Sequence, residues 1–304
     1  MKTPMLYRQF AGQADIDAEY NPAARLSDPG VYQRHYVEQS RLARERLPGL
    51  QGVRFGPTLA ETLDIFPATQ PDAPVFVFIH GGYWRAFSSG DFSCVALGLQ
   101  ALGITTVVVN YALAPSVGID EITRQTRAAL AWVLRNIERH GGDPARVAVG
   151  GHSAGAHLAA MALQTRWSDD YGLPEDPFRA AVLVSGLYDL EPLRHSYLQP
   201  QIQLDDGVIR RNSPLFSVRA CPTPVLLTWG AEESAEFVRQ STAFHAAWTG
   251  AGNRSSCAPQ HGANHYSAIF GFEQSASAIC AWIESQLFAG LGPAPHPLSD
   301  STDS

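Results

Sequence analysis

RVAVGGHSAGAHLAAMAL, residues 146–163, is the stretch of sequence that decides the fold. It opens with a short apolar run, Val147–Val149, which favours a β-strand. Glycines then surround one serine, Ser153, and a run rich in Ala, Leu and Met follows, which favours a helix. The pattern therefore predicts a strand, a sharp turn that carries the serine, and a helix.

Residues 151–155, GHSAG, fit the G-x-S-x-G pattern of a nucleophile elbow. A strained turn pushes the serine hydroxyl out of the sheet, and the helix N-terminus behind it favours negative charge that develops there. A serine is a weak nucleophile at neutral pH, so it needs a base and a third group that orients the base. The alternative is a glycine-rich turn without chemistry, so the assignment of Ser153 as nucleophile depends on partners elsewhere in the chain.

The composition is that of an ordinary globular protein. The 304 residues are 45% hydrophobic and 17% charged, with a formal net charge of −7. Because Lys and Arg are not clustered, we expect neither nucleic acid nor a membrane as a partner. No window approaches the ~18 apolar residues of a membrane span, and the first ten residues lack a signal-peptide core. With four scattered cysteines, these features predict a cytoplasmic protein that acts on a small molecule, and whether it forms a homodimer stays open.

Apolar runs alternate with helical stretches along the chain, which predicts βαβ units and a parallel sheet. The run at 74–79, PVFVFI, is typical of a strand buried on both faces. We therefore expect an α/β fold, with a mostly parallel central sheet and helices on both faces. Strands are expected at 51–55, 61–66, 74–79, 104–109, 147–149, 179–185, 224–228 and 255–258, and helices at 31–46, 92–102, 119–140, 154–163, 235–249 and 272–288.

The domain organisation follows from the same pattern. Residues 31–288 are expected to form one domain, because no linker divides them. Residues 1–30 have turn signals and predict an irregular N-terminal arm. Residues 191–219 predict an irregular or short-helical insertion that could serve as a lid. Residues 289–304 are rich in Gly, Pro, Ser and Asp and predict a disordered tail.

Candidate partners for the serine follow the later strands, where parallel sheets bind their ligands. His265 lies after the last expected strand and before the last helix, which suits the base in the order serine, acid, histidine. His261 is the rival. Glu233 follows the strand at 224–228 and is the best-placed acid. The alternatives for the acid are Glu232, Glu236 and Asp189.

HGGYW, residues 80–84, follows the buried run at 74–79 and predicts an oxyanion loop. Glycines let the backbone approach a substrate closely, and two N–H groups must face the developing charge. We assign these donors to Gly82 and Ala154, with Tyr83 as a third; the alternative is a plain glycine turn. His261 and His265 have the spacing of a zinc pair, but they lie in a loop without an acid, so we expect no metal and no cofactor.

These motifs resemble those of the α/β-hydrolase kynurenine formamidases (arylformamidases), relatives of the hormone-sensitive-lipase-like esterases. HGGYW matches the family's H-G-G-x-W signature, in which Trp84 replaces a third glycine. The resemblance covers about residues 15–288 and implies the α/β-hydrolase fold and hydrolysis of N-formyl-kynurenine to kynurenine and formate. The acid is commonly aspartate in that family, whereas Glu233 stands here. Similar patterns are GHSAGAHL at 151–158, SGLYDL at 185–190, RNSP at 211–214, EFVRQS at 236–241 and YNP at 20–22.

An aromatic leaving group would stack on aromatic side chains of the pocket. Tyr83, Trp84, Tyr188 and His152 are the candidate substrate contacts; the alternative is that they anchor loops or pack the turn. A broad carboxylesterase or amidase for short acyl groups would use the same triad and differ only in the leaving group. A non-catalytic binding protein of this fold would usually lack a triad member, and none is missing here.

Overall fold

A computed structural model describes residues 5–289, in which eight strands form one sheet in the order β1-β2-β4-β3-β5-β6-β7-β8. The strands from β4 to β8 along this order are all parallel, whereas β2 is antiparallel to both β1 and β4. The mostly parallel sheet predicted from the buried runs is therefore confirmed. The strands are β1 Leu50–Arg54, β2 Thr62–Phe66, β3 Ala73–Ile79, β4 Thr105–Val109, β5 Gly142–His152, β6 Ala180–Val184, β7 Val225–Gly230 and β8 Ser255–Gln260.

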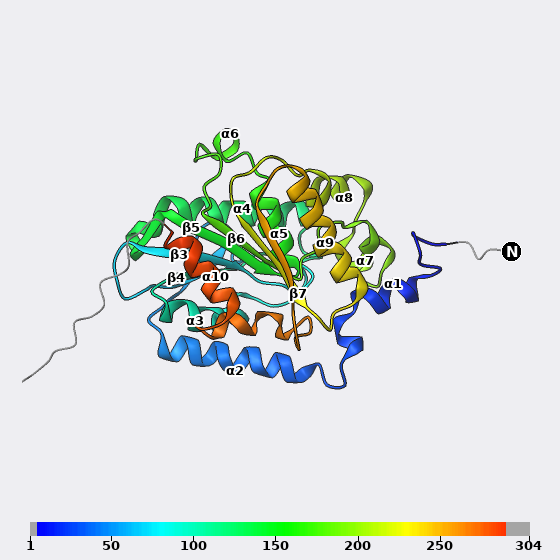
Figure 1. Cartoon of the computed structure of the whole chain (residues 1–304), viewed down its shortest axis with the longest axis horizontal. Helices are drawn as coiled ribbons and strands as arrows, with labels where there is room; N and C mark the ends of the chain where they lie inside the picture. Colours follow the sequence, from blue (N-terminus) through cyan, green and yellow to red (C-terminus); the bar gives the residue numbers. More distant parts are fainter. Residues whose placement is uncertain (1–4, 290–304) are drawn as a thin grey trace, which may run out of the picture.

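Helices cover both faces of the sheet, as expected (Figure 1). The α-helices are α1 Gln13–Tyr20, α2 Gly30–Arg46, α3 Ala96–Ala101, α4 Ile119–Asn136, α5 Ala154–Leu163, α6 Trp167–Tyr171, α7 Gln199–Ile202, α8 Asp206–Asn212, α9 Ala235–Gly250 and α10 Ala278–Leu287. The 3-10 helices are η1 Pro22–Arg25, η2 Ser89–Val95, η3 Ile137–His140, η4 Glu191–His195, η5 Pro214–Phe216 and η6 Ser267–Glu273.

The central strand β3 shows why two helical layers are needed. Successive side chains of a strand point to opposite faces. Val75, Val77 and Ile79 pack in the apolar cluster that contains the buried faces of α4, α5 and α9. Phe76 and Phe78 pack in the other cluster, which contains buried side chains of α2, α3 and α10. All seven residues of β3 are buried, so each face requires its own cover.

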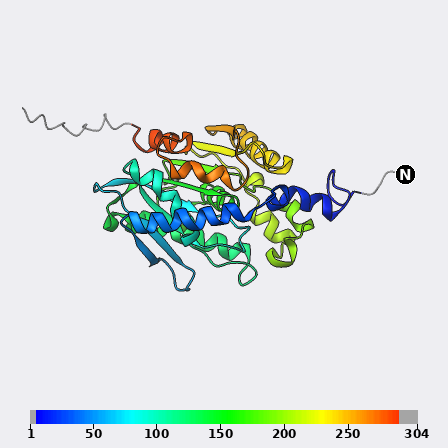
Figure 2. The ribbon, with the colours of Figure 1, turned by 90° about the horizontal axis from the view of Figure 1, so that it is seen from below.

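The N-terminal segment differs from the irregular arm that the sequence predicted, because it contains α1 and η1. Asp15 accepts hydrogen bonds from the backbone of Ala11 and Gly12, which begins α1. Ile16 and Tyr20 are wholly buried. Figure 2 shows this segment beside the short helices of residues 191–219. A helix of eight residues is marginal alone, so its packing against the rest of the chain stabilises it.

Further elements also differ from the expectation: β5 begins before the expected 147–149, and the helix expected at 119–140 is divided into α4 and η3. The last predicted helix is split into η6 and α10, and Ser277 caps the second by accepting a hydrogen bond from the Cys280 N–H. The helix expected at 92–102 begins as the 3-10 helix η2. The short helix α6 was not predicted. Residues 191–219 do form short helices, and the predicted disordered tail lies, apart from Ala289, outside the described residues.

None of the helices described between residues 5 and 289 is long and apolar enough to cross a membrane.

Candidate active site

Ser153 lies on a strained turn between β5 and α5. Its φ of 56° and ψ of −117° lie in a region that non-glycine residues rarely adopt. The turn leaves no room for side chains around it. A Cβ on Gly155 would lie 1.9 Å from the Ile79 carbonyl oxygen, and a Cβ on Gly151 would lie 2.4 Å from the backbone of Gly155. The two glycines of the motif are therefore sterically required.

Glu233 lies beside His265, and both its oxygens are held. Glu233 follows β7, and its Oε2 accepts a hydrogen bond from His265 Nδ1 at 2.8 Å. Its Oε1 accepts from the Gly230 N–H at 2.7 Å and from Ser185 Oγ at 2.5 Å. When the proton of the neutral ring is on Nδ1, Nε2 of His265 is unprotonated and is the nitrogen that can act as a base. Ser153 and His265 line the same cavity.

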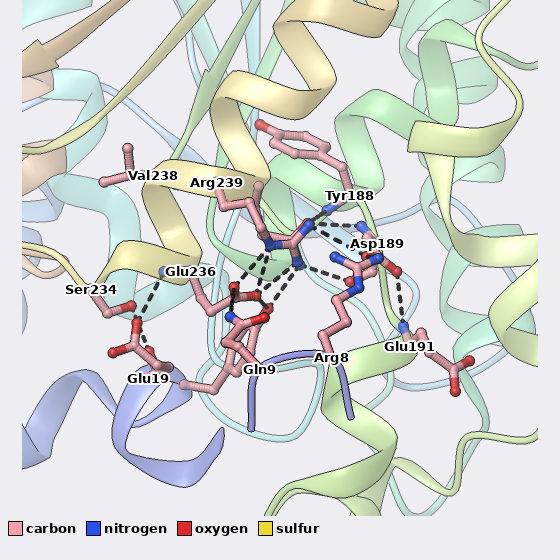
Figure 3. Close-up of polar contacts among 12 residues, drawn as sticks. Arg8, Gln9, Glu19, Tyr188, Asp189, Glu191, Ser234, Glu236, Val238 and Arg239 are labelled. Carbon is pink, nitrogen blue, oxygen red and sulfur yellow. Dashed lines mark hydrogen bonds and ion pairs between the residues drawn. The ribbon is translucent and has the colours of Figure 1, made fainter. Parts of the chain in front are cut away.

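The other acid candidates lie elsewhere. Glu232 is exposed. Asp189 and Glu236 belong to an ion-pair cluster with Arg8 and Arg239 (Figure 3). In this cluster Arg8 lies 3.0 Å from Asp189, and Arg239 lies 2.8 Å from Glu236. Of the four candidates, only Glu233 contacts His265.

The same cluster ties the N-terminal segment to α9. Tyr20 donates a hydrogen bond of 2.6 Å to Glu236 Oε2, and Gln9 donates to Oε1 of the same carboxylate. Burial would raise the pKa of Glu236, but hydrogen bonds from Arg239 and Tyr20 together hold it below its usual value. The carboxylate thus serves as an anchor for residues 9–20. The rival histidine, His261, is exposed on a turn.

The loop that follows β3 bends sharply beside the serine. Gly82, Tyr83 and Trp84 have φ values of 107°, 49° and 58°, all in the left-handed region. A Cβ on Gly82 would lie 2.3 Å from the Ala86 carbonyl oxygen, so this position requires glycine. Among residues 5–289, the N–H groups of Gly82, Tyr83 and Ala154 have no hydrogen-bond partner. Free N–H groups next to a nucleophile can bind a developing oxyanion.

His152 holds the loop that carries His265. Its Nε2–H donates a hydrogen bond of 2.8 Å to the backbone carbonyl of His265, and the two ring centroids are 4.7 Å apart. Burial lowers the pKa of His152 well below its usual value, so the ring stays neutral. His152 lines the cavity, as expected of a substrate contact, but its hydrogen bond also gives it a positioning role that the sequence did not reveal.

The cavity next to Ser153 has a volume of about 360 Å³. Tyr83 lines it as predicted, and its hydroxyl donates to the Tyr20 carbonyl at 2.6 Å. Several aromatic side chains from distant segments also line it and were not predicted from the sequence: Tyr36, Phe87, Phe92, Tyr197 and Tyr266. Residues 21–23 of the N-terminal segment complete the wall. Such an aromatic lining suits a flat, apolar ligand.

Trp84 and Tyr188 do not line this cavity, which corrects the expected pocket wall. Both side chains are wholly buried. Trp84 Nε1 donates to His157 Nδ1 at 3.2 Å, and His157 Nε2 donates to the Asn212 carbonyl at 2.7 Å. Tyr188 stacks on Phe244 with ring centroids 4.3 Å apart. Both aromatic rings therefore anchor the core around the site, which is the alternative that the sequence left open.

Within the described part of the chain, no group of three or more His, Cys, Asp or Glu side chains could hold a metal ion.

Comparisons with known proteins agree with this geometry. A family model described as the alpha/beta hydrolase fold matches residues 76–266. The kynurenine formamidase of Danio rerio is 30% identical over 84% of this chain and 89% of its own length. Esterase LipC of Mycobacterium tuberculosis is also 30% identical, over 78% of this chain and 62% of its own length.

Solved structures show the same fold. A crystal structure of a protein from Silicibacter sp. tm1040 superposes with a TM-score of 0.78 at 26% identity, over 88% of this chain and 98% of that one. The carboxylesterase EstE1, cloned from a metagenomic library, has a TM-score of 0.67 at 19% identity, over 88% and 99% of the two chains.

The chain therefore belongs to the α/β-hydrolase family. It is an enzyme that acts on amide or ester bonds, and its relatives include both kynurenine formamidases and esterases.

Proposed function

We propose that this enzyme hydrolyses aryl N-formyl amides, with N-formyl-L-kynurenine as its substrate and kynurenine and formate as its products. The observation that carries the proposal is the contact of Glu233 with His265 at the cavity that Ser153 also lines. The aromatic lining of the cavity supports an aryl leaving group. The similarity to kynurenine formamidases, over more than three quarters of the chain, supports the formamide.

In the proposed acylation step, His265 takes the proton of the Ser153 hydroxyl while the serine oxygen bonds to the formyl carbon. The carbonyl electrons move to its oxygen, and the N–H groups of Gly82, Tyr83 and Ala154 stabilise that charge. When the carbonyl reforms, the C–N bond breaks, and protonated His265 gives its proton to the aryl amine. Glu233 stabilises the imidazolium throughout this step.

Deacylation reverses these roles. The formyl group is then an ester of Ser153, and a water molecule gives its proton to His265 as it attacks the formyl carbon. The C–O bond to Ser153 breaks, the serine oxygen recovers the proton from His265, and formic acid leaves and gives its remaining proton to solvent to become formate. The ring of His265 must keep its orientation through both steps, which the hydrogen bond from His152 to its backbone and the contact with Phe237 support.

The test compares kcat/KM for N-formyl-L-kynurenine and p-nitrophenyl acetate in the wild type and in Ser153→Ala. The proposal expects efficient cleavage of the formamide and loss of both activities in the variant, which should remain folded by circular dichroism. Activity near wild type in Ser153→Ala would contradict the triad.

The second candidate is a carboxylesterase for short acyl groups, which the esterases among the relatives favour. It would use the same triad. Cleavage of the activated ester without any cleavage of the formamide would select this candidate.

We further propose that the enzyme works in the cytoplasm. All four cysteines are free thiols, and three of them are buried, which suits a reducing compartment. Fractionation of cells followed by an assay of formamidase activity would test this location.

A further inference from the structure

Among the residues that the structure describes, Arg85 is the one permanently charged side chain in the lining of the cavity. Its other members in the described part of the chain are the imidazole rings of His152 and His265, uncharged polar groups and aromatic rings, with no carboxylate among them. The chain as a whole carries a net charge of −7, so a lone cation facing the substrate cavity runs against the overall charge. A positive charge without an acidic neighbour in a cavity attracts an anionic ligand.

The backbone of Arg85 is fixed to the loop that we assign to the oxyanion. Its N–H donates a hydrogen bond of 3.0 Å to the Gly82 carbonyl, and the Ala86 N–H donates to the same oxygen at 3.1 Å. A ligand group bound to Arg85 would therefore be held at a defined place relative to Ser153.

The guanidinium is oriented by neutral groups. Its Nη1 donates a hydrogen bond to Gln201 Oε1 on α7, and its central carbon, Cζ, lies 5.8 Å from the centre of the Tyr197 ring. Both partners belong to the insertion at 191–219, so the insertion shapes the cavity through Arg85. Other arginines of the protein, such as Arg124 and Arg239, contact carboxylates. Arg85 forms no ion pair within residues 5–289.

A guanidinium has five N–H donors in a planar fork that matches a carboxylate. One donor of Arg85 is used by Gln201, which leaves the other donors of the fork for a ligand, and the half-buried residue lines the cavity. A paired hydrogen bond between this fork and a carboxylate is stronger than a bond between neutral groups.

We propose that Arg85 is a specificity-determining residue that binds a carboxylate on the leaving group of the substrate. The preferred substrates are then aryl amides or esters whose aromatic part carries an acidic side chain. This inference rests on the proposed function, since N-formyl-L-kynurenine has a carboxylate on its leaving group.

The test uses a pair of substrates that differ only in the carboxylate: N-formyl-L-kynurenine and N-formylkynuramine. The quantity measured is the ratio of their kcat/KM values, in the wild type, in Arg85→Gln and in Arg85→Lys. In Arg85→Gln we expect this ratio to fall by about 10- to 100-fold, mainly through a higher KM for N-formyl-L-kynurenine. Arg85→Lys should give an intermediate ratio, because a lysine keeps the charge and loses the fork.

Arg139→Gln is the matched control, since it removes the same charge. Arg139 is exposed on η3, before β5, at the opposite end of the strand from Ser153. Its ratio should equal that of the wild type. If Arg85→Gln lowers kcat/KM for both substrates equally, Arg85 acts only on the structure of the loop and the proposal is wrong. An unchanged ratio would also overturn it.

A second pair of substrates separates this proposal from the proposed function. If the wild type cleaves neither formamide, the formamidase proposal fails, and the same ratio is measured with 3-acetoxybenzoate and phenyl acetate. If Arg85→Gln lowers the ratio of kcat/KM for 3-acetoxybenzoate to that for phenyl acetate by about tenfold or more, the carboxylate site is upheld on an esterase. An unchanged ester ratio would refute it.

Discussion

The change from Glu233 to glutamine tests the triad most sharply, because glutamine keeps the shape of the side chain and removes its charge. The Glu233 side chain is wholly buried, and Oε1 accepts hydrogen bonds from the Gly230 N–H and the Ser185 hydroxyl. In the variant, the amide oxygen keeps these two donors. The amide NH2 group must then face His265 Nδ1, where a carboxylate oxygen accepted a hydrogen bond.

The size of the effect follows from two losses. The Glu233 carboxylate and the imidazolium of His265, with charge centres about 4 Å apart in an effective dielectric of about 20, attract each other by about 4 kcal/mol. The variant loses this stabilisation of the transition state. This corresponds to about a 10³-fold lower kcat. A donor facing Nδ1 also moves the proton of the neutral ring to Nε2, which removes the base, so the loss can reach about 10⁴-fold.

The assay is the steady-state kcat for N-formyl-L-kynurenine or p-nitrophenyl acetate, whichever the wild type cleaves faster. Thermal unfolding shows whether the variant is folded. Glu232→Gln is the matched control, because Glu232 is adjacent and exposed, and it should change kcat less than about threefold. Asp189→Asn tests the rival acid. A loss below tenfold in Glu233→Gln, or an equal loss in Asp189→Asn with an intact fold, would refute the assignment.

Four further results are expected. Gly155→Ala should give no folded protein, because its Cβ would lie 1.9 Å from a carbonyl oxygen, whereas Gly118→Ala, with nothing within 4 Å, should express normally. Tyr20→Phe should lower the free energy of unfolding in urea by about 1.5–3 kcal/mol, since it removes a buried hydrogen bond to a carboxylate; a change below about 0.5 kcal/mol would contradict that anchor. Burial lowers the pKa of His157 to about 4, so between pH 6.5 and 4 the unfolded chain binds a proton that the folded chain does not, and stability falls as the pH falls. His157→Gln should reduce the slope of unfolding free energy against pH in this window by about 1.4 kcal/mol per pH unit, and an unchanged slope would show that His157 titrates normally. Incubation with EDTA should leave kcat unchanged, and a loss that added metal restores would refute a mechanism by serine, histidine and glutamate alone.

Much of the fold is determined locally and could be predicted. The G-x-S-x-G pattern marked the strained turn, and Gly151 is required within the turn because its Cβ would meet the backbone of Gly155; Gly155 is required because its Cβ would meet the backbone of the adjacent strand β3. The apolar runs predicted the parallel strands because both their faces are buried. Glu233 was predicted as the acid because it follows a strand, and the structure places it within hydrogen-bond distance of His265.

Tertiary structure decided what depends on contacts far apart in the sequence. Trp84 and Tyr188 are aromatic residues on site loops, but the direction of a loop side chain is set by its packing partners, and both turn into the core. The bond from His152 to His265 spans 113 positions, and the bond from Tyr20 to Glu236 spans 216. No local pattern encodes such pairs.

The sequence by itself determined the order of strands and helices, the strained serine turn and the identity of its candidate partners, because backbone sterics and strand burial act over a few residues. Only the tertiary structure decided which side chains wall the cavity and that α1 forms, because these depend on free energy from segments brought together by the whole fold. Arg85 shows the difference: in the sequence it is one arginine among many, and the fold makes it the single permanent charge in the cavity lining formed by residues 5–289.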